Sequence, residues 1–142
     1  MDSHQRAPLS DIKVHVKMIL SALWVSLMCC YVYGDFIGLY KPGKLQGLLE
    51  GMMPLGPITQ GVLLAIAIVM AIPSLMVFLA LVLKPALNRR LNIVFGVIYT
   101  VIMLLTMRPG AWTFYIFLGV VEVMLTALIV WHAWTWSREQ PA

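Results

Sequence analysis

Four long apolar runs, separated by short polar stretches, account for most of the chain. They cover about residues 18–40, 58–83, 91–107 and 111–136. An α-helix rises about 1.5 Å per residue, so roughly 20 apolar residues cross the hydrocarbon core of a bilayer. The pattern therefore predicts four transmembrane helices, of which the third is short but long enough.

The connection between the first two runs has its own pattern. Leucine and methionine recur at the spacing of one helical face over residues 44–53, and Pro42 and Pro54 bracket this stretch. We expect a short amphipathic helix that lies in the outer interface and covers the mouth of the bundle. Simple anchoring and a gating role both remain open for it.

The other connections are short, which makes neighbouring helices antiparallel. Pro85 disfavours helix at Lys84, and Asn88 is a candidate N-cap for the third helix. Residues 108–110 form a tight outer turn. The expected fold is an all-α membrane protein, one domain over residues 1–142 whose four transmembrane helices form an up-down-up-down bundle.

Composition and charge agree with lipid as the solvent. The chain is 61% hydrophobic and 11% charged, whereas a soluble domain is about half apolar and about a quarter charged. Seven of the ten basic residues flank the helices on the side that carries both termini. The positive-inside rule makes that side cytoplasmic, so the net charge of +4 is a topology signal and indicates no nucleic-acid partner.

Glu122 is the acid that lies deepest in the predicted bilayer, roughly 15 Å below the outer interface by helical rise. A charge at the bilayer centre costs about 2.5–3.5 kcal/mol on insertion scales, so this carboxyl is expected in its neutral form. Tyr31 and Tyr99 are expected at nearly the same depth and complete a central polar layer. Two interpretations stay open: a proton-responsive or ligand-binding carboxyl, and a structural hydrogen-bond staple.

Other polar groups lie away from this layer. Asp35 is one turn nearer the outer surface and is expected to pair with Arg108, either to fix topology or to form part of a site. Asn92 lies about one turn into the third helix and should face protein. Pro73 removes a backbone hydrogen bond in the second helix and frees a carbonyl near Val69, which predicts a kink.

The sequence contains no phosphate loop, dinucleotide fingerprint, nucleophile elbow or zincin motif. His132 has no second histidine or cysteine at ligand spacing, so neither a metal nor a cofactor is expected. The adjacent Cys29 and Cys30 are expected to pack as small apolar side chains. An intramembrane enzyme that uses Asp35 or Glu122 is the least supported function, because no nucleophile accompanies them.

Several short motifs run along the chain: YVYGD at 31–35, ITQGVLL at 58–64, IPSLM at 72–76, NRRLNI at 88–93, and YIF at 115–117 followed by Glu122. Together they resemble a bacterial family of small four-helix membrane proteins that is known only as a domain of unknown function. The resemblance covers nearly the whole chain after Ser21. It implies the four-helix architecture and the bacterial inner (plasma) membrane, and it implies no activity. The outline is also similar to DoxX-like proteins, by analogy of shape alone.

Two functions are consistent with these observations. The bundle could bind or transport a small apolar or amphipathic molecule or a lipid at the polar layer; transport by only four helices would call for a homo-oligomer. Alternatively, it is a structural or accessory subunit whose buried acids only specify packing. The candidate ligand-binding or proton-linked residues are Glu122, Tyr31, Tyr99, Asp35, Arg108 and Asn92.

Overall fold

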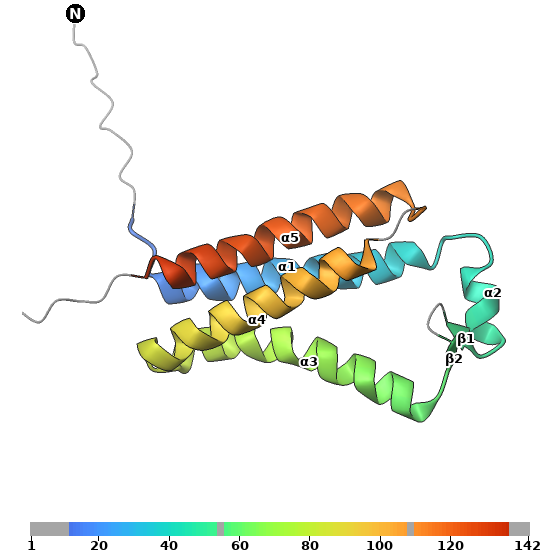
Figure 1. Cartoon of the computed structure of the whole chain (residues 1–142), viewed down its shortest axis with the longest axis horizontal. Coiled ribbons are helices and arrows are strands. Elements are labelled where there is room, and N and C mark those ends of the chain that lie inside the picture. Colours follow the sequence, from blue (N-terminus) through green and yellow to red (C-terminus); the bar gives the residue numbers. More distant parts are fainter. Residues whose placement is uncertain (1–11, 54–55, 108–109, 137–142) are drawn as a thin grey trace, which may run out of the picture.

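The computed structural model describes residues 12–53, 56–107 and 110–136, most of them in helices (Figure 1). The long helices are α1 (Val16–Gly38), α3 (Gln60–Val82), α4 (Pro85–Thr106) and α5 (Thr113–Trp134). The short elements are α2 (Lys44–Leu49), β1 (Met52–Met53) and β2 (Gly56–Pro57). All four long helices have the length and hydropathy needed to cross a membrane, and they pack against one another. This confirms the predicted class, while the alternating direction of the helices across a bilayer stays a prediction.

The start of α4 differs from the sequence-based expectation. Lys84 is the N-cap and Pro85 occupies the first turn, where a missing backbone N–H costs nothing and the fixed φ angle suits a helix. Asn88 therefore lies inside the helix, and its prediction as the N-cap is wrong. The polar residues between the second and third apolar runs form the first turns of α4 and not a loop.

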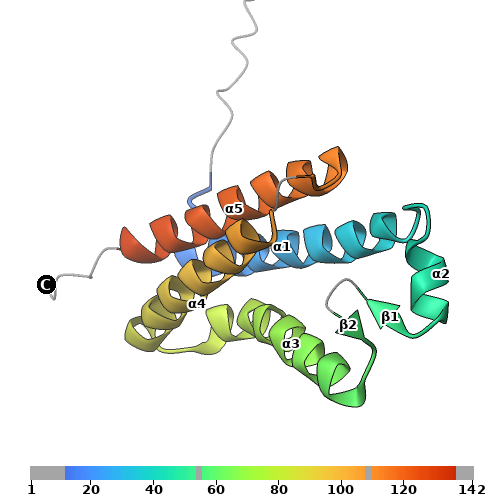
Figure 2. The same ribbon diagram turned by 45° about the vertical axis from the view of Figure 1, so that its right-hand side comes forward.

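The interfacial segment is shorter than the expected helix over residues 44–53. α2 ends at Leu49, and Gly51 follows with a φ of 76°, a left-handed conformation that ends helices and that glycine adopts without strain. β1 and β2 then pair antiparallel, with Met52 opposite Pro57. In Figure 2 these elements lie beyond the end of α1 and beside the start of α3. None of the residues of α2 is buried.

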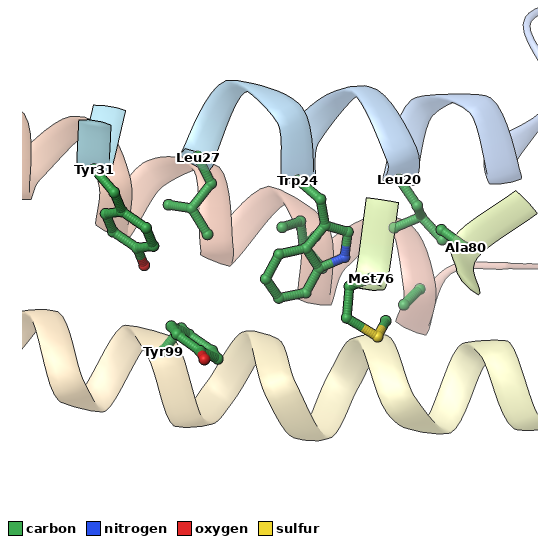
Figure 3. Close-up of a cluster of buried hydrophobic side chains, with 9 residues drawn as sticks. Leu20, Trp24, Leu27, Tyr31, Met76, Ala80 and Tyr99 are labelled. Carbon is green, nitrogen blue, oxygen red and sulfur yellow. The ribbon is translucent and has the colours of Figure 1, made fainter. Parts of the chain in front are cut away.

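α1 supplies the largest share of the core. Its residues Leu20, Trp24, Leu27 and Tyr31 recur along one helical face and are all buried. Figure 3 shows these side chains directed at residues of the other helices. The partners in the buried cluster are Met76, Ala80, Tyr99, Ile129 and Ala133.

The outward faces of the long helices are apolar as well. Large side chains such as Leu64, Phe78 and Phe117 are 60%, 60% and 66% exposed. A helix that is apolar all round belongs in a protein core or a membrane. The exposed surface of the bundle is therefore compatible with a lipid bilayer.

α4 and α5 approach each other closely at Gly96. A Cβ atom at Gly96 would lie 2.7 Å from Cγ2 of Val130, so a larger residue would push the helices apart. Beside this contact, Thr100 Oγ1 donates to Thr126 Oγ1 at 2.7 Å. A small residue next to a polar contact is the usual way in which membrane helices associate.

A hydrogen bond between two helices compensates for the proline in α3. Pro73 has no N–H, so the carbonyl of Val69, four residues earlier, lacks its intrahelical donor. The Tyr99 hydroxyl on α4 donates to that carbonyl. Ser74 Oγ also turns back and donates to the Met70 carbonyl at 3.0 Å. The irregular backbone of α3 is therefore satisfied from inside the protein, as a low-dielectric solvent requires.

We predict that Tyr99→Phe lowers the free energy of unfolding in detergent by about 0.6–1.7 kcal/mol, the range for hydrogen bonds between membrane helices. In a Pro73→Ala background the new N–H donates to the Val69 carbonyl, so the same substitution should cost much less. Unfolding of the single and double variants measures this coupling. Tyr33→Phe, at an exposed tyrosine of α1, is the matched control, and its effect on the free energy of unfolding should simply add to that of Pro73→Ala. Simple additivity of Tyr99→Phe with Pro73→Ala would contradict the compensation.

Candidate functional site

A cavity of about 370 Å³ lies between the four long helices. The end of α1, the start of α3, the end of α4 and the start of α5 form its walls. Most of the lining is apolar: Gly34, Ala65, Ile66, Val69, Met70, Ile102, Met103 and Leu118. The polar lining residues are Tyr31, Asp35, Tyr99, Thr106, Tyr115 and Glu122. An apolar cavity with a few convergent polar groups, at the lower end of the usual 300–1,000 Å³ or so, is typical of a small-molecule site.

The path of α3 opens this cavity. α3 packs along α1 but makes few contacts with α4. Figures 1 and 2 show its first half diverging from α4, while its second half returns to the bundle. Pro73 lies between these halves, at the position where a proline kinks a helix.

Glu122 is carried into the cavity by the buried face of α5. Gly119, Glu122, Thr126 and Ile129 recur at helical spacing along that face, and all four are buried. Glu122 is 6% exposed. Its backbone carbonyl accepts from Thr126 Oγ1 at 3.0 Å, whereas its carboxyl group has no hydrogen-bond partner among the residues that the structure describes.

Tyr31 brings a second polar group to the same space. The residue is 7% exposed, and its hydroxyl is fully buried without a hydrogen-bond partner within the described part of the chain. A buried hydroxyl that lacks a partner costs about 1–3 kcal/mol. Its ring lies 6.4 Å from the ring of Tyr99, at a tilt of 33° (Figure 3). The two tyrosines therefore differ, because the Tyr99 hydroxyl is bonded to α3, whereas the Tyr31 hydroxyl is buried without a partner in the described structure.

Asp35 follows Tyr31 by one turn of α1 and lines the cavity from an exposed position. The cavity thus receives one carboxyl group from α1 and one from α5. Arg108, the expected partner of Asp35, lies outside the described residues, so that ion pair stays a prediction.

Asn92 belongs to a different cluster and does not line the cavity. It is fully buried and accepts from Trp24 Nε1 at 2.7 Å. Its side-chain amide donates to Asn88, to the carbonyl at 2.9 Å and to Oδ1 at 2.6 Å. Asn88 in turn donates to the Ala80 carbonyl at 2.6 Å. This chain of hydrogen bonds joins α1, α4 and α3 and uses the polar atoms of both asparagines.

Two features of the site were not anticipated from the sequence. One is the Trp24–Asn92–Asn88 chain, for which the four-residue spacing of the asparagines was the available signal. The other is the Tyr99–Val69 bond, for which the freed carbonyl near Pro73 was the signal. Within the described residues, no group of three or more His, Cys, Asp or Glu side chains could hold a metal ion.

We predict that Asn92→Ala lowers the free energy of unfolding by about 1–3 kcal/mol, because Trp24 Nε1 then stays buried without an acceptor. Trp24→Phe should cost less in the Asn92→Ala background than alone, which a double-variant unfolding cycle measures. Neither substitution should change the binding of a molecule in the cavity. An Asn92→Ala protein of normal stability with altered ligand binding would contradict the structural role.

Comparison with known proteins gives a family and no activity. No curated protein and no solved structure matches the chain. The sequence profile of a family of unknown function (DUF6326) matches residues 10–142. That match covers all four long helices and every residue of the cavity, so the chain belongs to this family of unknown function.

Proposed function

We propose that the protein is an integral membrane protein that binds a small apolar or amphipathic molecule in the cavity between its four long helices. The observation that carries this proposal is the Tyr31 hydroxyl, which is buried at the cavity without a partner in the described structure. A polar group of this kind gains the most from a ligand, because the ligand supplies the missing hydrogen bond.

The lining indicates how such a molecule would lie. Its apolar part packs against Ile66, Met70 and Ile102, and its head group hydrogen-bonds to Tyr31 and Glu122. The sparse contact between α3 and α4 supports entry from the lipid side. Apart from the tyrosines, the ionisable groups of the described lining are two carboxyls. A head group that donates hydrogen bonds therefore suits the site better than an anion.

Glu122 would couple binding to protons. A carboxyl group removed from water is stabilised by protonation or by a donor close to it. A ligand whose head group donates to Glu122 therefore competes with a proton for the same oxygen atoms. Proton-linked binding or transport follows from this competition, and transport through four helices would use a homo-oligomer.

The alternative is a structural or accessory subunit. The Trp24–Asn92–Asn88 chain and the Thr100–Thr126 bond favour it in part, since they are polar contacts that only hold helices together. They also satisfy their own members without help from the Tyr31 hydroxyl or the Glu122 carboxyl group. The cavity therefore contains polar groups that the packing of the bundle does not need, and this favours binding over a purely structural role.

The position in the cell follows from charge and from the family resemblance. We propose a bacterial plasma membrane, with one up-down-up-down domain and both termini in the cytoplasm. The excess of basic residues on the side of the termini supports this orientation. We assign no catalytic role to Asp35 or Glu122.

We predict that Tyr31→Phe leaves the stability of the ligand-free protein unchanged or higher, because it removes an unsatisfied hydroxyl. It should weaken the binding of decylamine and decanol about 5- to 10-fold, the equivalent of one hydrogen bond. Thermal shift in detergent and native mass spectrometry measure both quantities. Decanoate, an anionic probe of equal chain length, should bind more weakly than decylamine or decanol.

Tyr33→Phe is the matched control for this experiment. Tyr33 is an exposed tyrosine of the same helix that does not line the cavity, so the substitution should leave both stability and probe binding nearly unchanged. If Tyr31→Phe destabilises as much as Tyr99→Phe and leaves probe binding unaltered, the structural alternative replaces the binding site.

We predict that probe-dependent stabilisation of the wild-type protein changes with pH and that Glu122→Gln removes most of this change. Glutamine imitates the protonated carboxyl group and cannot titrate, and the carboxyl group of Asp35 that remains in the lining is exposed. Glu50→Gln is the matched control, because Glu50 is exposed on the outer connection and hydrogen-bonds only to Gln46 at 2.8 Å among the described residues. A pH response that persists unchanged in Glu122→Gln would exclude the proton link.

A further inference from the structure

A second hollow lies at the opposite end of the bundle from the cavity. It is a groove of about 1,220 Å³ between the start of α1, the start of α4 and the end of α5. The lining residues on which the argument rests are Val16, Lys17, Ile19, Arg89, Arg90 and Ile93. This groove shares no residue with the cavity, so a ligand of the groove is independent of the function proposed for the cavity.

The groove gathers positive charge. Lys17 comes from α1, Arg89 and Arg90 come from α4, and two histidines, His15 and His132, stand beside them. None of the described lining residues is acidic. Three cations with no carboxyl group in the described lining create a field that attracts an anion.

Two of the cations are held in place by neutral acceptors. Lys17 Nζ donates to the carbonyls of Leu81 and Leu83 at 3.2 and 2.8 Å. The Arg89 guanidinium donates to the Trp134 carbonyl at 2.9 Å. The central carbon of the guanidinium lies 6.0 Å from the centre of the Trp134 ring. Carbonyls and rings position these groups, but no carboxyl group of the described residues compensates their charges. Arg90 is exposed, and the described structure gives its guanidinium no partner.

The start of α4 adds a further attraction for an anion. Arg89 and Arg90 lie in its first two turns, and the first N–H groups of a helix have no intrahelical acceptor. The positive end of the helix dipole points the same way. Arginine and free N–H groups at a helix start are a combination that binds phosphate.

The remaining walls are apolar. Val16 and Ile19 on α1 and Ile93 on α4 line the groove beside the charged groups. The exposed rings of Trp131 and Trp134 lie at the same end of α5, and tryptophan favours the headgroup level of a bilayer. A bare inorganic anion has no use for apolar walls, whereas a phospholipid presents a phosphate and an acyl chain side by side.

We propose that this groove binds the headgroup of an anionic phospholipid, with the phosphate at Arg90 and the start of α4 and the first part of an acyl chain against Val16, Ile19 and Ile93. Bound lipid would bridge α1, α4 and α5 at the end of the bundle where their polar residues gather. It would also fix the depth of this end in the membrane.

The test compares lipids with identical chains on the full-length protein in detergent. Phosphatidylglycerol should raise the unfolding temperature and remain bound in native mass spectra, whereas phosphatidylcholine and inorganic phosphate should do neither. Arg90→Gln should weaken phosphatidylglycerol binding at least about tenfold, and Arg90→Lys should retain part of it. Because Arg90 is exposed, these variants should fold normally.

Lys84→Gln is the matched control. It removes one positive charge from an exposed residue at the same end of the bundle that does not line the groove, and it should leave phosphatidylglycerol binding within about twofold of wild type. Equal losses in Lys84→Gln and Arg90→Gln would overturn the groove in favour of general attraction by a basic surface. An equal response to inorganic phosphate would overturn lipid as the ligand.

Discussion

The hydrogen bond from the Tyr99 hydroxyl to the Val69 carbonyl is the contact on which the arrangement of the bundle depends. Pro73 breaks the backbone ladder of α3 at this point, and inside a bilayer no water is available to repair it. Tyr99 repairs it from α4. Together with the bond from Asn88 to the Ala80 carbonyl, it holds α3 to α4, and contacts between these two helices are otherwise sparse.

The bundle is divided by this contact into two parts of different character. Toward the termini, Leu20, Trp24 and Leu27 fill the space between the helices, and Asn92 ties α1 to α4 through Trp24. Toward α2, the helices enclose a cavity whose walls are apolar and which holds a tyrosine hydroxyl unsatisfied by the described residues. One part is closed and internally bonded, and the other contains a cavity, so the two halves of the same four helices differ in how tightly they are packed.

Some of this could be predicted from the sequence because hydropathy and helical rise act along a single chain. The four helices followed from apolar runs, and counting residues grouped Tyr31, Tyr99 and Glu122, which all line the cavity. The rotation of a helix about its axis depends on its neighbours, so the pairing of Asn92 with Trp24 did not follow. The start of α4 was predicted too late because Asn88 and Arg89 resemble loop residues. Inside the helix, Asn88 donates to the Ala80 carbonyl and Arg89 to the Trp134 carbonyl, and these contacts between helices cannot be read from the local sequence.

Buried polar groups in this protein are therefore of two kinds: those with hydrogen-bond partners and those without. Asn88 and Tyr99 donate to backbone carbonyls, Asn92 donates to Asn88, and Thr126 accepts from Thr100, so contacts within the bundle satisfy these groups. Among the described residues the Tyr31 hydroxyl has no partner. A closed bundle would be more stable with phenylalanine at this position, because phenylalanine has no hydroxyl to leave unsatisfied. An apolar medium increases the energetic cost of an unsatisfied hydroxyl. A group that weakens the empty protein and is satisfied by a molecule that enters the cavity is the expected mark of a binding site.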